Sequence, residues 1–287
     1  MRSRSASTLV ATVGVMALVL VACGDDGGSD GGSASGSSPT TTTVVEAEVA
    51  QVLVTNDDGV GSAGIDAVVT ALAGRDDVEI TVVAPAEQQS LKGDQTSPQP
   101  PAAEETTTVS GYPATAVDGF PADSVNYGLG DDVDTDFDLV VAGLNEGQNL
   151  GQTVDLSGTV GAAATAARAG VAALAANQGL VAASDAEPEY EPGVEQVMAW
   201  LDENLEAVVA GERAGTLESL NIPTCTAGQL RGLAEVPLAD DNEGQFDQFT
   251  VDCTSELEDP VDDVEAFTNG FATLTELDPA VTGQSVQ

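Results

Sequence analysis

The sequence predicts an α/β fold with a mainly parallel sheet, helices on both faces in a Rossmann-like three-layer arrangement, and a less regular C-terminal extension. The first observation behind this is that short apolar, β-branched runs alternate with segments of helical spacing from Gln51 onward. The second is that several of these runs end at oxygen-bearing or glycine-rich segments, which is where ligands bind in parallel sheets. The last 60 or so residues lack this periodicity.

The first expected strand is the apolar run at residues 52–55. Residues 64–72 are expected to be a helix, because their apolar positions recur three and four residues apart. A second strand at residues 78–84 is closed by Pro85. Residues 88–111 are polar and rich in proline and threonine, so we expect a long loop that is functional or mobile.

A short strand is expected at residues 114–117, followed by a helix at 121–128 that Pro121 can begin. A third clear strand occupies residues 137–142. Residues 143–158 are rich in glycine and asparagine and are expected to form a loop.

Residues 159–169 form an alanine-rich expected helix that Gly170 ends. A strand at 171–176 follows, and residues 193–210 have the clearest helical spacing in the chain. Residues 217–222 are expected to be a further strand.

The N-terminus has the pattern of an export signal. Arg2 and Arg4 precede an apolar stretch at residues 10–21 that is too short to span a membrane comfortably. The stretch ends in Leu20-Val21-Ala22-Cys23, which resembles a bacterial lipobox. We therefore expect residues 1–22 to be a lipoprotein signal peptide and Cys23 to be lipidated, with an ordinary secretory signal as the alternative.

Residues 23–47 are expected to be a flexible Gly/Ser/Thr tether after the lipidated cysteine, because they contain almost nothing that could be buried. Residues 48–287 then suit one large α/β domain. The expected location is extracytoplasmic, with the chain anchored to the bacterial cell membrane only through its lipid.

The chain is strongly acidic, with a formal net charge of −41, no histidine and only seven lysine and arginine residues. A nucleic-acid polymer is excluded as a partner on this basis, because no basic patch exists to neutralise phosphates. Apart from Cys23, the only cysteines are Cys225 and Cys253, which an exported protein is expected to pair, with two free thiols as the alternative. This disulfide would contribute about 3 kcal/mol to stability in the chain-entropy model.

Asn56, Asp57 and Asp58 directly follow the first strand. Two adjacent carboxylates repel one another unless a cation lies between them, so they indicate either a divalent metal site or a solvated turn. Ser90 follows the second strand and Asn145 the third. Parallel strands present their carboxyl ends at one edge of the sheet, which allows these side chains to converge on one ion.

Six segments resemble, in order, the SurE-like (survival protein E) 5'/3'-nucleotidases. They are residues 55–59, 64–65, 83–90, 121–125, 138–151 and 157–163. The resemblance implies a metal-dependent phosphatase of nucleoside monophosphates or other small phosphomonoesters, here in an exported lipoprotein form. It also implies that one Mg²⁺ or Mn²⁺ is held by Asp57, Asp58, Ser90 and Asn145, with Asp57 and Asp58 as the catalytic residues.

Substrate contacts are expected from Asn56, Asn149, Ser157, Gly158 and Thr159. The last three precede a helix, and hydroxyls and N–H groups at a helix N-terminus bind phosphate. The alternative is that Ser-Gly-Thr only caps the helix. Asn149 is equally consistent with holding the glycine-rich loop in shape.

Three other residues bear on this reading. Leu91 follows Ser90 where the family usually has glycine, and Lys92 is the only lysine, which is either solvated or a phosphate contact. Asp123 is expected to be structural, at the start of a helix. The competing function is a non-catalytic metal- or nucleotide-binding surface lipoprotein, and a homo-oligomer is left open.

Overall fold

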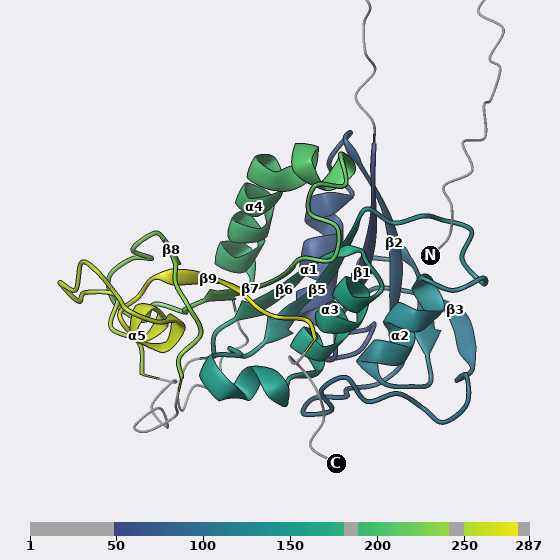
Figure 1. Ribbon diagram of the computed structural model, residues 1–287, viewed down its shortest axis with the longest axis horizontal. Coiled ribbons are helices and arrows are strands. Elements are labelled where there is room, and N and C mark those ends of the chain that lie inside the picture. Colours follow the sequence, from purple (N-terminus) through teal and green to yellow (C-terminus); the bar gives the residue numbers. More distant parts are fainter. Residues whose placement is uncertain (1–48, 181–188, 241–249, 281–287) are drawn as a thin grey trace, which may run out of the picture. The chain divides into compact units, whose positions relative to one another are not determined.

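A nine-stranded sheet forms the middle layer of the protein, as the computed structural model shows over residues 49–180, 189–240 and 250–280 (Figure 1). The strand order is β3-β4-β2-β1-β5-β6-β7-β9-β8. The strands are β1 (Ala50–Thr55), β2 (Val78–Pro85), β3 (Ala103–Thr107), β4 (Pro113–Val117), β5 (Leu139–Glu146), β6 (Ala172–Gln178), β7 (Leu217–Ile222), β8 (Leu233–Glu235) and β9 (Ala272–Glu276). The helices are α1 (Ala63–Leu72), α2 (Pro121–Gly128), η1 (Gly151–Asp155, 3₁₀), α3 (Gly158–Arg168), α4 (Glu191–Val209) and α5 (Asp263–Thr268).

The six strands from β4 to β7 in this order run parallel to one another. Antiparallel pairs occur only toward the two ends of the described sheet, between β3 and β4 and between β7 and β9. The expected mainly parallel α/β fold is therefore confirmed. Its parallel part brings the carboxyl ends of β1, β2 and β5 to one edge.

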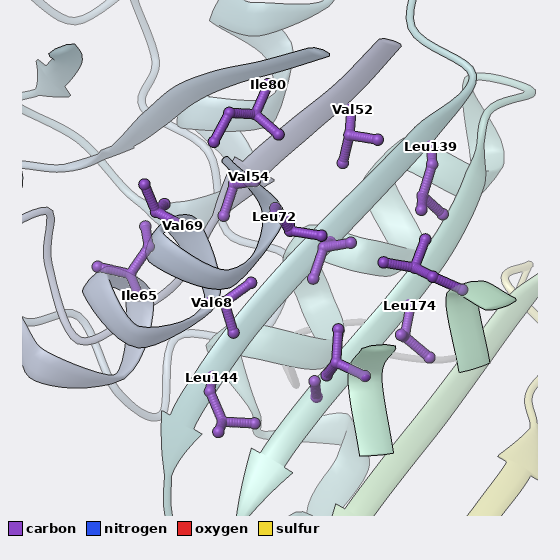
Figure 2. Packing of buried hydrophobic residues seen from close by; sticks show 14 of the residues in the cluster. Val52, Val54, Ile65, Val68, Val69, Leu72, Ile80, Leu139, Leu144 and Leu174 are labelled. Carbon is purple, nitrogen blue, oxygen red and sulfur yellow. The ribbon is translucent and has the colours of Figure 1, made fainter. Parts of the chain in front are cut away.

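The core consists of two apolar layers, one on each face of the sheet. Alternate residues of β1 enter different layers, since Val52 and Val54 join α1 and α4 whereas Leu53 joins α2 and α3. Figure 2 shows the layer on the α1 face of the sheet. In it Ile65, Val69 and Leu72 of α1 pack on Val54 of β1 and Ile80 of β2.

Helix α3 packs closely on its face of the sheet because nearly all of its buried side chains are small. Its alanines are all but fully buried, and they meet the alanines of β6 in the same layer. At Gly161 a Cβ atom would come 2.2 Å from the backbone of Gly93, so the segment after β2 also lies directly on this helix. The site loops described below are held between these elements.

Two expected boundaries were wrong. Residues 88–111 are not wholly a loop, because β3 pairs with β4 at Ala103–Thr107. This edge strand is largely exposed and polar, so it carries no apolar alternation that could have indicated it. The third clear strand continues to Glu146 through a bulge between Ala142 and Asn145, which places Asn145 on β5 and not in a loop.

The C-terminal extension adds β9 and β8 to the end of the sheet away from β3 (Figure 1). Cys225 and Cys253 form a disulfide with a Cα–Cα distance of 5.7 Å, which confirms the expected pairing. Among the described helices, none has the length and apolarity required to cross a membrane. The expected signal peptide, Cys23 and tether lie outside the described residues.

We expect Gly64→Ala to lower the free energy of unfolding by about 2 kcal/mol, because the new Cβ would lie 1.9 Å from the carbonyl oxygen of Leu144. Gly61→Ala is the matched control, since nothing lies within 4 Å of its Cβ position. Urea unfolding should show a change within about 0.5 kcal/mol for the control. Equal stability of the two variants would contradict the close approach of α1 to β5.

Candidate functional site

The candidate site lies where the strand order reverses. The chain passes from β1 to β2 on one side, and β5 later pairs with β1 on the other side. Connections therefore leave the carboxyl ends of β1 and β5 in opposite directions, which opens a crevice of the type where α/β proteins bind ligands. Asp57 and Asp58 follow β1 at this point, and Asn145 lies near the end of β5.

Asp57 is buried against the N-terminus of α3. Asp57 is only 3% exposed, and its Oδ1 accepts a hydrogen bond of 2.6 Å from the Thr159 hydroxyl. Gly158 permits this approach, because a Cβ there would lie 2.8 Å from the Asp57 carboxylate. Burial raises the pKa of Asp57, while hydrogen bonds from the side chain of Thr159 and the amides of Thr159 and Gly158 oppose this rise.

Asp58 is half-buried, and its Oδ2 accepts a 2.9 Å hydrogen bond from the backbone N–H of Glu146. Burial, followed by the neighbouring charge of Asp57, raises the pKa of Asp58 to about 7. The hydrogen bond from the backbone N–H of Glu146 opposes this rise of the pKa, and the charge of Glu146 adds to it by a smaller amount. The pair is thus electrostatically strained without a cation, as the sequence reading anticipated.

Asn145 carries the feature that best fits a ligand. Its Nδ2 donates a 2.6 Å hydrogen bond to the carbonyl oxygen of Gly147, so the orientation of its amide is set. Its Oδ1 is buried and has no hydrogen-bond partner in the described chain. A buried acceptor without a partner carries a free-energy cost of about 1–3 kcal/mol, which a cation at this position would relieve.

Ser90 is half-buried on the loop that follows β2. The backbone N–H of its neighbour Gln89 donates a 2.6 Å hydrogen bond to the carbonyl oxygen of Asp57, which joins the two loops. The Ser90 Oγ accepts a 2.6 Å hydrogen bond from Gln88. Leu91 adopts a left-handed backbone with φ of +62°, a conformation that is uncommon for a residue other than glycine.

These four residues fit a hard divalent cation. Among the described residues, no three histidine, cysteine, aspartate or glutamate side chains are grouped as a metal centre. The candidate set therefore needs the hydroxyl of Ser90 and the amide oxygen of Asn145 beside the two carboxylates. An all-oxygen set suits Mg²⁺ or Mn²⁺ better than a metal that prefers sulfur or nitrogen.

Asn56 braces the turn that carries the two aspartates. Its Nδ2 donates to the carbonyl oxygen of Gly59 at 2.9 Å and to the Ser62 hydroxyl at 2.8 Å. Its Oδ1 is buried without a partner in the described chain. The amide nitrogen is therefore engaged in the turn, and only the oxygen is free to contact a ligand.

Asn149 holds its loop to the ends of β6 and β7. Its Nδ2 donates to the Oδ1 of Asn177 at 2.7 Å, and its backbone N–H donates to the Oδ1 of Asn221 at 2.8 Å. Of the two roles considered for Asn149, the structure displays the loop-holding one. A substrate contact by this residue stays a prediction.

The Ser-Gly-Thr segment bonds within the protein. The Ser157 Oγ accepts a 3.1 Å hydrogen bond from the N–H of Val160 and so caps α3, and the Thr159 hydroxyl is engaged with Asp57. The N-terminus of α3 thus faces a carboxylate of the chain itself. A phosphate contact by Ser157, Gly158 or Thr159 stays a prediction.

The structure also shows the surroundings of Asp123 and Lys92. Asp123 accepts hydrogen bonds from the N–H and hydroxyl of Ser97 and from the N–H of Phe120, so it fastens the long polar segment to the start of α2. This is the structural role that was expected. Lys92 is half-buried and makes no ion pair with any residue of the described chain.

The hydrogen bonds that hold Asp57 and Asp58 in place were not predicted from the sequence. Glu146 positions Asp58 through its backbone N–H. The sequence signal that could have indicated this role is its position next to Asn145 at the end of the strand. The hydrogen bond from Thr159 to Asp57, which joins residues 102 positions apart, was not predicted. No local pattern encodes such a contact.

Comparison with known proteins gives a consistent family. The family described as Survival protein SurE matches residues 52–244. A 5'-nucleotidase SurE of Methanopyrus kandleri is 43% identical over 45% of this chain and 48% of that protein. One from a Synechococcus strain is 29% identical over 80% of this chain and 92% of that protein.

The chain thus matches about half the length of the Methanopyrus relative and nearly all of the Synechococcus one. Among solved structures, the SurE protein from Aquifex aeolicus aligns with a TM-score of 0.63 and 22% identity, over 81% of this chain and 94% of that one. At this identity the structural likeness supports the fold alone.

Without metal, we expect the free energy of unfolding to fall as the pH rises from about 4 to about 7, the window between the ordinary and the raised pKa of Asp58. Across this window the folded state binds the proton more tightly than the unfolded state, so ionisation destabilises the fold. The contribution is on the order of 2 kcal/mol after allowance for solvent screening. Urea unfolding with EDTA at pH 5 and pH 8 measures it.

Asp58→Asn is the control, because it removes this titration and should lose less stability between the two pH values. Mn²⁺ should restore stability at pH 8 to the wild type and not to the variant. An identical pH dependence in both proteins would show that Asp58 ionises as an ordinary surface carboxylate.

Proposed function

This chain belongs to the SurE family, and on that premise we propose that it is a divalent-metal-dependent phosphomonoesterase that hydrolyses nucleoside 5'- or 3'-monophosphates. The relatives named 5'-nucleotidase SurE support this activity. The single observation that carries the metal dependence is the unpartnered buried oxygen of Asn145 beside the crowded carboxylates of Asp57 and Asp58.

The distribution of positive charge supports the same conclusion. The arginines of the described chain all bond to carboxylates or carbonyl oxygens: Arg75, Arg168, Arg213 and Arg231. A phosphate dianion approaching the acidic site therefore lacks an arginine to receive it. A bound cation is the economical way to make that edge attractive to phosphate.

A divalent ion bound there would polarise the phosphoryl group and lower the pKa of a coordinated water. The residues of the chain would hold that ion in position and would transfer protons. Asp57 is immobilised by Thr159, so it suits a fixed ligand role. Asp58 is more exposed than Asp57, so it is the better placed of the two to contact water or substrate.

We expect Asp57→Asn and Asp58→Asn each to lower metal-dependent phosphate release from nucleoside monophosphates by about 100-fold or more, because each removes charge that holds the cation. The assay compares 5'- and 3'-monophosphates of each base with Mn²⁺, with Mg²⁺ and with EDTA. Asp76→Asn is the matched control, since Asp76 is exposed and precedes β2 at the opposite edge of the sheet.

Near-wild-type turnover in both site variants would refute the metal-site assignment. Nucleotide binding without phosphate release by the wild type would instead favour the non-catalytic binding lipoprotein. Circular dichroism of each variant ensures that lost activity reflects the site and not unfolding.

We further propose that the enzyme works at the cell surface, anchored by lipid at Cys23. The support is the sequence Leu20-Val21-Ala22-Cys23 directly after an apolar core, followed by a segment with almost no apolar residues to bury. The proposed ligands are far from Cys23 in the chain, so catalysis should not depend on the anchor.

We expect Cys23→Ala to accumulate as unprocessed precursor or to be released as soluble protein, because the lipobox then has no cysteine to be acylated. Membrane fractionation with immunodetection measures this, and Ser29→Ala in the tether is the control. A Cys23→Ala protein that stays in the membrane fraction at its mature size would contradict lipid anchoring at this residue.

A further inference from the structure

Asp263 is a buried carboxylate that the proposed chemistry does not use. It lies at the first position of α5 in the C-terminal extension and is 1% exposed. Its Oδ2 accepts a 2.8 Å hydrogen bond from the N–H of Gly151, and its Oδ1 accepts a 2.9 Å hydrogen bond from the N–H of Ala239. One carboxylate thus joins three segments that are far apart in sequence.

Burying a carboxylate has a large desolvation cost, and this burial raises the pKa of Asp263. The two backbone hydrogen bonds offset the cost only while both oxygens are acceptors. An asparagine of the same shape has one acceptor and would set its NH₂ group against one of the two N–H donors. The position therefore specifically requires a carboxylate.

Gly151 ends the loop that begins after Glu146, the last residue of β5. It has a φ of +52°, a conformation that favours glycine, and it starts η1. The loop is fixed at its first end by β5, where Asn145 presents its unpartnered oxygen. Its second end is Gly151, two residues beyond Asn149, and the hydrogen bond to Asp263 fixes this end.

Helix α5 is itself held firmly, so Asp263 is a stable point of attachment. At its far end the carbonyl oxygen of Thr268 accepts a 2.8 Å hydrogen bond from the N–H of Asp252, next to the disulfide residue Cys253. A Cβ at Gly270 would lie 2.6 Å from the Cα of Cys253, so the two backbones are in direct contact. Phe267 of α5 is fully buried.

We propose that Asp263 is a positioning residue of the nucleotidase site: it holds residues 145–151 in place opposite Asp57 and Asp58, and it thereby makes the C-terminal extension part of the site. This rests on the proposed function for its catalytic consequence, although not for the positioning itself. The residue does not contact substrate or metal and acts through the loop.

The test compares Asp263→Asn with Asp262→Asn in the purified protein. Asp262 is the adjacent carboxylate and caps α5 by accepting from the N–H of Glu265, a role that asparagine fills equally well. Titration calorimetry with Mn²⁺ alone should give a dissociation constant raised about 10-fold in Asp263→Asn and unchanged in Asp262→Asn. Amide hydrogen exchange should quicken at residues 145–151 and not at residues 56–59.

If Asp263 has a purely structural role, Asp263→Asn should show faster amide exchange only at residues 237–240 and 250–277, a lower melting temperature and unchanged Mn²⁺ affinity. This result would overturn the proposal. If Asp263→Asn does not fold, the wild-type Gly151 amide decides instead. Slow exchange there supports the hydrogen bond to Asp263, and exchange at the unprotected rate overturns it.

The two proposals fail separately. If the wild type releases no phosphate from any nucleotide while the loop still loosens in Asp263→Asn, the proposed function is wrong and the positioning role stands. If the wild type is an active nucleotidase and Asp263→Asn matches it in Mn²⁺ affinity and loop exchange, the positioning role is wrong.

Discussion

The hydrogen bond from Thr159 to Asp57 is the contact on which the site depends, because it joins the start of α3 to the end of β1. A carboxylate as buried as that of Asp57 is tolerated only when donors surround it. The donors reach it because Gly158 has no side chain and because the alanines of α3 allow this helix to lie close to the sheet. Packing on one face of the sheet thus sets the electrostatics at its edge.

Charge explains why this edge should attract a cation before it attracts a phosphate. The chain has a net charge of −41, and Asp57, Asp58 and Glu146 add their charges at one crevice. Asn145 contributes an acceptor that the fold leaves without a donor. A carboxylate pair and a free amide oxygen form a poor binding site for an anion and a good one for Mg²⁺ or Mn²⁺. Under the proposed function, an ion bound there would provide the recognition of phosphate.

The C-terminal extension has a larger part in the molecule than its irregular sequence suggested. It adds β9 and β8 to the sheet, carries the disulfide, and reaches the glycine-rich loop through Asp263. The loop is consequently held by the strand that precedes it, by the ends of β6 and β7, and by a helix more than 100 residues later. This arrangement ties the stability of the extension to the geometry of the crevice.

The sequence by itself determined the parallel sheet, the boundaries of α2 and β7 and the aspartates at the end of β1, because these follow from local periodicity, turn residues and adjacent charges. It also determined the disulfide, because an exported protein with two remaining cysteines is expected to pair them. It did not reveal β3, whose exposed polar residues pair only because β4 offers an edge. It left open whether Ser157 and Thr159 bind phosphate or cap a helix, and the structure shows their hydroxyls bonded to Val160 and Asp57. Only the tertiary structure decided these points and the role of Asp263, since hydrogen bonds between residues distant in the chain depend on packing that no local pattern records.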